Sequence, residues 1–298
     1  MNMTNLINDP NASRLIYGLR DTGYNVRTAA ADIIDNSIAA GANNINIQID
    51  LMHDGRKLVY FGDDGCGMDQ EEVHKAMRYG ADRRPDAKSL GKFGLGLKTA
   101  SSSVCKRYSV ISRKTSDKPL AKLTWDLEHV ESRNAWEMLA DPVTADQQDV
   151  FEELCGDMGT LVIWENCDRL LSKEYTPGAK EQVAVKNLAK ALSKHVSLVF
   201  HRFLDIEDER ERDVAILING TPVEPWNPFY PQKSDQVLAP NKQKLEVEMF
   251  DGSVETAYMR AWILPHRSDM EKDEEAKFAR ISNKAQGFYV YRAGRLIQ

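Results

Sequence analysis

The apolar positions near the start of the chain follow two different periods. Between residues 26 and 40, small and apolar side chains recur at helical spacing and predict a buried helix: Ala29, Ala30, Ile33, Ile34, Ser37 and Ile38. Gly41 then provides the positive-φ residue that ends such a helix. Ile45, Ile47, Ile49 and Leu51 alternate with polar residues, which predicts a half-buried strand.

The same two periods predict the other elements of the chain. Further strands are expected at 58–61, 108–113, 121–127, 160–165, 214–218, 245–250, 255–264 and 287–291. Helices are expected at 69–79 (capped by Asp69), 94–104, 145–154, 179–203 and 269–280. Asn219-Gly220 suits the type I′ turn of a hairpin, and the polar, glycine-rich stretch 80–96 predicts a loop.

Composition narrows the class of protein. With 42% hydrophobic and 28% charged residues, the chain of 298 residues has the balance of a soluble globular protein. It has no apolar run of about 18 residues and no leading signal-peptide pattern, so we expect no membrane contact and a cytoplasmic location. The net charge of −6 means that any DNA contact would need a local basic patch, and none is obvious.

The first candidate for chemistry is the predicted helix around residue 34. Asp32 and Asn36 are four residues apart and share one helix face, where burial would be costly without polar partners. Asp35 lies on a different face, as a surface residue or one that supports the site from behind. Taken alone, this pattern would equally suit the polar stripe of an amphipathic helix.

The second candidate is the segment from Asp63 to Met68, which follows a strand. Gly65 and Gly67 would let a flat ligand lie close to the backbone. The Asp63 carboxylate could accept a hydrogen bond from an exocyclic amine such as that of adenine. An acidic β-turn is the plainer alternative for so short a motif.

The third candidate is the glycine-rich segment before the predicted helix 94–104. Its alternating glycines would free backbone N–H groups to bind phosphate, helped by the helix N-terminus. The residues concerned are Gly91, Lys92, Phe93, Gly94, Leu95 and Gly96, with Lys98 just inside the helix. The spacing fits neither a Walker loop nor a dinucleotide fingerprint.

The order and spacing of these three segments resemble the nucleotide motifs of the GHKL superfamily, which groups gyrase, heat-shock chaperone, histidine kinase and MutL ATPases. Gly159-Thr160, opening a late strand, agrees with that family's Gly-Thr. Prokaryotic MORC-like ATPases are the closest likeness, through the segments 19–24, 31–37, 80–101, 286–291 and 295–297.

The resemblance implies an α+β fold with two domains. Residues 1–204 would form a Bergerat-type α/β sandwich that binds ATP, with an N-terminal strap over 1–20 and an ATP lid over about 79–98. Residues 205–298 would form a transducer-like α/β domain of the ribosomal S5-like type. The end at Gln298, soon after a predicted strand, would suit a fragment of a longer protein.

The resemblance also implies a role for each matching residue. Asn36 would hold Mg²⁺, Asp63 would bind adenine, and Thr160 would share a water with Asp63. The remaining nucleotide contacts would be Gly65, Gly67, Met68, Gly91, Lys92, Phe93, Gly94, Leu95, Gly96 and Lys98. Asp32 occupies the position of the general base, which is usually glutamate in the hydrolysing branches. Lys284 is the candidate for the transducer lysine that contacts the γ-phosphate, unless that lysine lies beyond Gln298.

The function expected from the resemblance is Mg²⁺-dependent ATP binding and slow hydrolysis. ATP would drive lid closure and formation of a homodimer, in a process involving DNA or a DNA-processing partner. A nucleotide switch that does not hydrolyse and a chaperone-like protein clamp remain alternatives. A histidine kinase is disfavoured, because its phosphoacceptor helix should precede the ATP-binding domain and little chain precedes the Asn36 helix.

Overall fold

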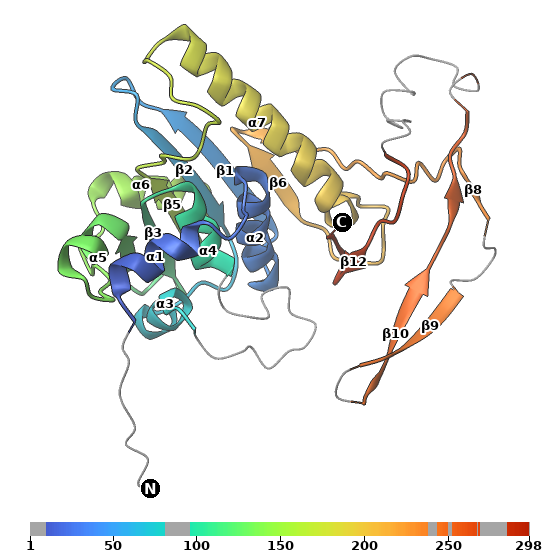
Figure 1. The fold of residues 1–298 in the computed structure, drawn as a ribbon, viewed down its shortest axis with the longest axis horizontal. Helices are drawn as coiled ribbons and strands as arrows, with labels where there is room; N and C mark the ends of the chain where they lie inside the picture. The colour runs from blue at the N-terminus through green and yellow to red at the C-terminus, as the bar shows by residue number, and fades with distance from the viewer. Residues whose placement is uncertain are drawn as a thin grey trace, which may run out of the picture.

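The chain folds around one mixed sheet with helices on both faces (Figure 1). This computed structural model describes residues 10–80, 96–237, 243–249, 252–266, 268 and 285–297. The sheet has seven strands in the order β4-β3-β5-β2-β1-β6-β7. Their bounds are β1 Asn44–Leu51, β2 Lys57–Asp63, β3 Arg107–Arg113, β4 Ala121–Asp126, β5 Gly159–Glu165, β6 Ala215–Ile218 and β7 Thr221–Pro222.

Side chains alternate across this sheet and fill two separate cores. In β5, Val162 and Trp164 face the larger core, whereas Leu161 and Ile163 face a smaller one beneath α6. The helices are α1 Ala12–Arg20, α2 Val26–Ala39, α3 Gln70–Met77, α4 Gly96–Val104, α5 Leu127–Arg133, α6 Ala145–Cys155, α7 Ala179–Val199 and α8 His201–Leu204. Within the described ranges, none of them has the length and apolar character of a membrane span.

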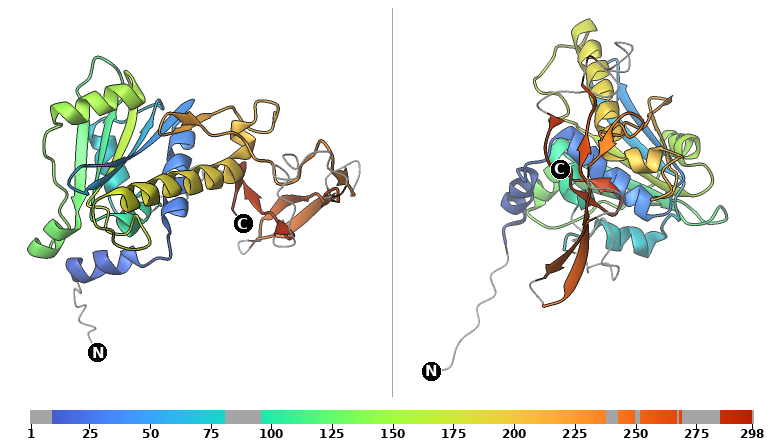
Figure 2. Two further views of the ribbon diagram at one scale, coloured as in Figure 1. Left: turned by 90° about the horizontal axis from the view of Figure 1, so that it is seen from above. Right: turned by 90° about the vertical axis from the view of Figure 1, so that its right-hand side faces the viewer.

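The helix α2 is the central element of the larger core. Asn25 caps its N-terminus through a capping box with Thr28, and its three isoleucines and the alanines at 29–31 are buried. The helix packs against α4 and α7, which lie on the same side of the sheet (Figure 2). The buried polar residues of α2, Asp35 and Ser37, are therefore held between layers of the fold.

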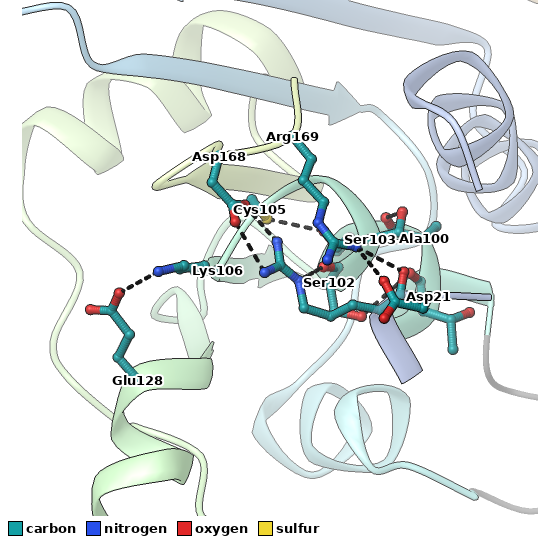
Figure 3. A network of polar contacts seen from close by, with 12 residues as sticks. Asp21, Ala100, Ser102, Ser103, Cys105, Lys106, Glu128, Asp168 and Arg169 are labelled. Atoms are coloured by element: carbon teal, nitrogen blue, oxygen red, sulfur yellow. Dashed lines mark hydrogen bonds and ion pairs between the residues drawn. The ribbon is translucent and has the colours of Figure 1, made fainter. Parts of the chain in front are cut away.

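An ion-pair network fixes α1 to this domain. The Arg20 guanidinium, whose side chain is 3% exposed, donates to the carbonyl of Ser102 at 2.7 Å and to both carboxylate oxygens of Asp168. Arg169 reaches back to Asp21 at 2.8 Å, so the two segments hold each other (Figure 3). Residues 12–20 of the predicted strap thus form a docked helix; residues 1–9 lie outside the described ranges.

The predicted elements agree with the structure in type over most of the chain, with three corrections. The expected helix 179–203 breaks at Phe200, and the expected strand 255–264 divides into β10 Val254–Met259 and β11 Trp262–Ile263. The expected strand 287–291 is wrong, because β12 covers only Tyr291–Arg292. The remaining strands are β8 Asp235–Gln236, β9 Gln243–Glu248 and β13 Arg295–Leu296. The predicted helix 269–280 lies outside the described residues.

The sheet continues beyond residue 205, where the sequence predicted a second domain to begin. β6 pairs in parallel with β1, and Asn219-Gly220 turns the chain into β7 with positive φ at both residues. The hairpin was therefore predicted correctly, but it completes the same sheet that carries α2. The last strand of this sheet, β7, ends at Pro222, so a division of the chain according to its sheets falls after residue 222.

Candidate nucleotide site

Asp63 lies at the end of β2 and is almost completely buried, with 5% of its surface exposed. The Ser37 hydroxyl donates to its Oδ2 at 2.7 Å, and the backbone N–H of Gly65 donates to its Oδ1 at 3.0 Å. Burial raises the pKa of Asp63 to about 6, although both hydrogen bonds oppose that rise. A carboxylate has about four lone-pair sites, so this buried group at a strand end can still accept a hydrogen bond from a ligand.

Thr160 lies directly opposite Asp63 in the β2–β5 register. Its hydroxyl hydrogen-bonds to the Ser112 hydroxyl at 2.9 Å, and Ser112 accepts from the backbone N–H of Met68 at 2.8 Å. Three strand ends and the turn after β2 therefore meet in one polar cluster. Ser37 and Ser112 had no predicted role, since serine in a buried helix or strand gives no distinctive pattern.

The glycines of this turn are required by close backbone approach. Gly67 has φ +60°, and a Cβ there would lie 2.0 Å from the carbonyl oxygen of Arg113. A Cβ at Gly65 would lie 2.9 Å from both Ala40 and the Asp63 carboxylate. Gly159 has φ +135°, and a Cβ there would lie 1.8 Å from the Asp63 carbonyl oxygen. The turn thus packs against the sheet with no room for side chains.

Asn36 directly precedes Ser37 on α2, and Asp32 lies about one helix turn before Asn36. Asn36 donates through Nδ2 to the backbone carbonyl of Asp32 at 2.8 Å, and no described residue donates to its amide oxygen. A neutral oxygen ligand of this kind suits Mg²⁺, which keeps several of its own waters. Asn36 and Asp32 share one face, as predicted, and α2 joins them to Asp63 through Ser37.

The glycine-rich segment is described only from Gly96, where α4 begins; Gly91, Lys92, Phe93, Gly94 and Leu95 lie outside the described residues. A Cβ at Gly96 would lie 3.5 Å from the Asp32 carboxylate, so the end of this segment adjoins Asp32.

Lys98, which the sequence predicts as a nucleotide contact, has a buried side chain. It is 2% exposed, and its ammonium donates to the backbone carbonyl of Ala76 at 2.9 Å. Lys98 therefore joins α4 to the end of α3 through this hydrogen bond.

Among the described residues, two side chains donate to the Asp32 carboxylate. The Tyr24 hydroxyl donates to Oδ2 at 2.5 Å, and Nη1 of Arg295 lies 3.0 Å from Oδ1. Tyr24 also hydrogen-bonds to Thr99 of α4, and its burial together with Asp32 raises its pKa to about 12. Arg295 also contacts Asp35, which is 4% exposed, so the surface position considered for Asp35 is wrong.

Of two further predicted site residues, Met68 lies in the described part of the chain and Lys284 does not. Met68 is half-buried against the larger core, and its backbone N–H contacts Ser112. Lys284 lies outside the described residues, so its predicted contact with the γ-phosphate stays a prediction. In the part of the chain that the structure describes, the C-terminal residue that reaches α2 is Arg295.

Comparison with known proteins identifies this arrangement. The family described as "Histidine kinase-, DNA gyrase B-, and HSP90-like ATPase" matches residues 24–160. This segment is a GHKL-family ATPase domain. Its bounds enclose α2, the Asp63 turn and Thr160, and membership implies that the domain binds ATP.

Individual relatives of the GHKL domain agree with this assignment. The chain is 32% identical to "ATPase MORC2" of Homo sapiens over 90 residues, which are 29% of this chain and 9% of that protein. It is 33% identical to "DNA mismatch repair protein MutL" of Anaplasma phagocytophilum (strain HZ) over 111 residues, 35% of this chain and 14% of that protein. "Protein MICRORCHIDIA 3" of Arabidopsis thaliana is 32% identical over 91 residues, 29% of this chain and 15% of that protein. The chain thus spans only a small part of these relatives.

Proposed function

We propose that this chain is a Mg²⁺-dependent ATPase of MORC-like type that binds ATP and hydrolyses it slowly. The observation that carries the proposal is the course of α2. Through Ser37 it holds the buried carboxylate of Asp63, it carries Asn36 directly before Ser37, and about one turn earlier it places Asp32 beside Gly96. A single rigid helix therefore joins a base-binding end to a phosphate-binding end.

At the base-binding end, Asp63 accepts a hydrogen bond from the adenine amine. The turn through Gly65, Gly67 and Met68 faces the adenine plane, and Thr160 contributes through a shared water. At the phosphate end, the backbone from Gly91 to Gly96 binds the phosphates. Asn36 holds Mg²⁺ through its amide oxygen, and the metal when bound neutralises charge on the phosphate oxygens.

Asp32 is the proposed general base. It adjoins Gly96, where the phosphate-binding segment enters α4, and its direction is fixed by Tyr24 and Arg295. A carboxylate in hydrogen-bond reach of the attacking water can take its proton. Aspartate is one methylene shorter than the glutamate usual in related ATPases, which is the reason for expecting slow turnover.

A switch that binds ATP without hydrolysis is the second candidate. Both oxygens of Asp32 already accept a hydrogen bond or ion pair from the protein, which leaves less of the carboxylate for a water. Phosphate release by the wild-type chain separates the two candidates.

We further propose a division of labour along the chain. The GHKL unit, with a lid over about 79–98, closes on ATP and forms a homodimer, and the C-terminal part acts as a transducer-like domain. The topology favours placing the division after residue 222 rather than near 205, because β6 and β7 complete the sheet. A DNA-related role is proposed from the names of the relatives, including a DNA mismatch repair protein.

The test measures phosphate release and calorimetric binding of Mg-ATP. Wild type should turn over, Asp32→Asn should bind ATP but lose turnover at least about a hundredfold, and Asn36→Ala should lose Mg²⁺-dependent binding. Asp149→Asn, an exposed aspartate on α6 beneath the opposite face of the sheet, is the matched control. Undiminished turnover in Asp32→Asn would remove Asp32 as the base. Absence of ATP binding by the wild type would overturn the proposal.

A further inference from the structure

The C-terminal hairpin of β12 and β13 contacts α2 through the side chain of Arg295. Nη1 of Arg295 lies 3.0 Å from Oδ1 of Asp32 and also contacts Oδ2 of Asp35. The two partners are about one turn apart on α2, whereas Arg295 follows Asp32 by 263 residues. The guanidinium therefore joins two distant parts of the chain at the site.

The hairpin that carries Arg295 is seated on the end of the α7–α8 segment. The Tyr291 hydroxyl hydrogen-bonds to Nε2 of His201 at 2.9 Å, and the Arg202 guanidinium lies 3.7 Å from the centre of the Tyr291 ring. Leu296, next to Arg295, is 6% exposed. A Cβ at Gly294 would lie 2.4 Å from Glu211, so the hairpin turn is also tightly packed. Arg295 thus extends to α2 from a hairpin that is held in place by packing.

The charges at this contact depend on Arg295. Asp35 is nearly completely buried, Asp32 is partly buried, and the Arg295 side chain is 15% exposed. Within the described residues, Oδ1 of Asp35 and Nε of Arg295 have no hydrogen-bond partner. Two buried carboxylates without a counter-charge would be costly, so the guanidinium is the group that keeps both in place.

We propose that Arg295 is a positioning residue for the Asp32 carboxylate, acting from the C-terminal hairpin. Tyr24 holds one oxygen of Asp32 and Arg295 holds the other, so the carboxylate keeps one direction beside Gly96. The inference rests on the proposed ATPase function, and it adds that turnover depends on the seating of the hairpin. In this proposal Arg295 acts through Asp32 and not through a contact of its own with the nucleotide.

The test compares catalysis with binding. Arg295→Gln should lower kcat about ten- to a hundredfold, because a base displaced by about 1 Å loses this much rate. Its affinity for a non-hydrolysable Mg-ATP analogue should stay within about twofold of wild type, since no nucleotide contact is lost. Arg295→Lys keeps the charge but not the planar guanidinium, so its kcat should lie between those of wild type and Arg295→Gln. The matched control is Arg292→Gln, an exposed arginine of the same hairpin, which should leave kcat unchanged.

The outcomes separate this inference from the proposed function. Turnover by Arg295→Gln equal to wild type would overturn the positioning role while leaving the ATPase intact. An equal loss of analogue binding and turnover would also overturn it, because that pattern indicates a direct nucleotide contact or a collapsed fold. Circular dichroism checks folding, and Arg295→Lys carries the comparison if Arg295→Gln does not fold. A wild-type chain without turnover would defeat the ATPase proposal itself, and this inference with it.

Discussion

At the residue scale, Asp63 is a carboxyl group whose environment works against its charge. Strand β2 ends by burying it, and hydrogen bonds from Ser37 and from the backbone of Gly65 and Thr160 compensate only in part. Its pKa rises from 3.8 to about 6 because desolvation outweighs those bonds. Such a group is costly to the fold, which is understandable where its carboxylate is needed to bind a ligand.

This pKa predicts a pH dependence of stability with a definite sign. Because the pKa is higher in the folded state, the folded chain binds more protons than the unfolded chain between about pH 4 and 6. The contribution of Asp63 is therefore fully present below pH 4 and falls as pH rises through 6, by about 3 kcal/mol. Urea unfolding at several pH values should show this decline in wild type and not in Asp63→Asn. Parallel pH profiles for the two proteins would contradict the buried, titrating carboxyl.

Gly67 allows a second prediction at this scale. Alanine there would bear the cost of positive φ, about 1–2 kcal/mol, and would also place its Cβ 2.0 Å from the Arg113 carbonyl oxygen. Gly41, which follows α2, has φ +79° with nothing within 4 Å of a Cβ, so Gly41→Ala bears only the first cost. Gly67→Ala should therefore lower the free energy of unfolding clearly more than Gly41→Ala. Equal losses in denaturant titrations would show that the turn has room to relax.

At the scale of elements, the anchoring of α1 depends on Arg20. Removing its guanidinium would leave Asp168 and the Ser102 carbonyl without their shared donor. Arg20→Gln should lower stability by roughly 3 kcal/mol, the low end for breaking a buried pair, because Asp168 remains partly exposed. Hydrogen exchange along α1 should quicken, whereas Arg14→Gln, an exposed arginine on the same helix, should change little. Unchanged exchange in Arg20→Gln would mean that packing alone holds α1.

Elements were predictable where their signal is local. The helix α2 and the strand β1 follow from side-chain period alone, and Asp69 and Asn219-Gly220 mark a helix start and a turn by their own chemistry. The segment 287–290 has the aromatic content of a strand but finds no strand partner, and pairing is a long-range property. The break at Phe200 likewise depends on packing that no single segment encodes.

The candidate site was predictable to the same extent. Asp32, Asn36, Asp63 and Thr160 lie in motifs whose spacing is characteristic, and the fold places them on α2 and on the strand ends next to it. Their roles toward ATP stay predictions. Arg295 was part of a motif but had no role, because its partner lies 263 residues away. The hydrogen bond from the Lys98 ammonium to the carbonyl of Ala76 could not be predicted from local spacing, and the phosphate contact predicted for Lys98 stays a prediction.

At the scale of the whole molecule, the sheet connects regions that the sequence appeared to separate. β6 pairs with β1 in the sheet. The hairpin that carries Arg295 returns to α2, so a segment near the C-terminal end of the chain contacts a helix near its N-terminal end. A ligand that favours one arrangement of these parts favours every interaction that depends on it. Under the proposed function, this gives nucleotide binding a route to the C-terminal part.

The last prediction concerns self-association. If ATP favours a closed form that dimerises, the two equilibria are linked and each must strengthen the other by the same factor. Light scattering should then show a monomer in buffer and a dimer with a saturating Mg-ATP analogue. Asn36→Ala should stay monomeric in both, since it lacks the metal ligand. Conversely, the apparent Kd for the analogue should fall as protein concentration rises through the dimerisation range. A molar mass that is the same with and without the analogue would contradict ATP-dependent dimerisation. An affinity for the analogue that is independent of protein concentration would contradict it as well.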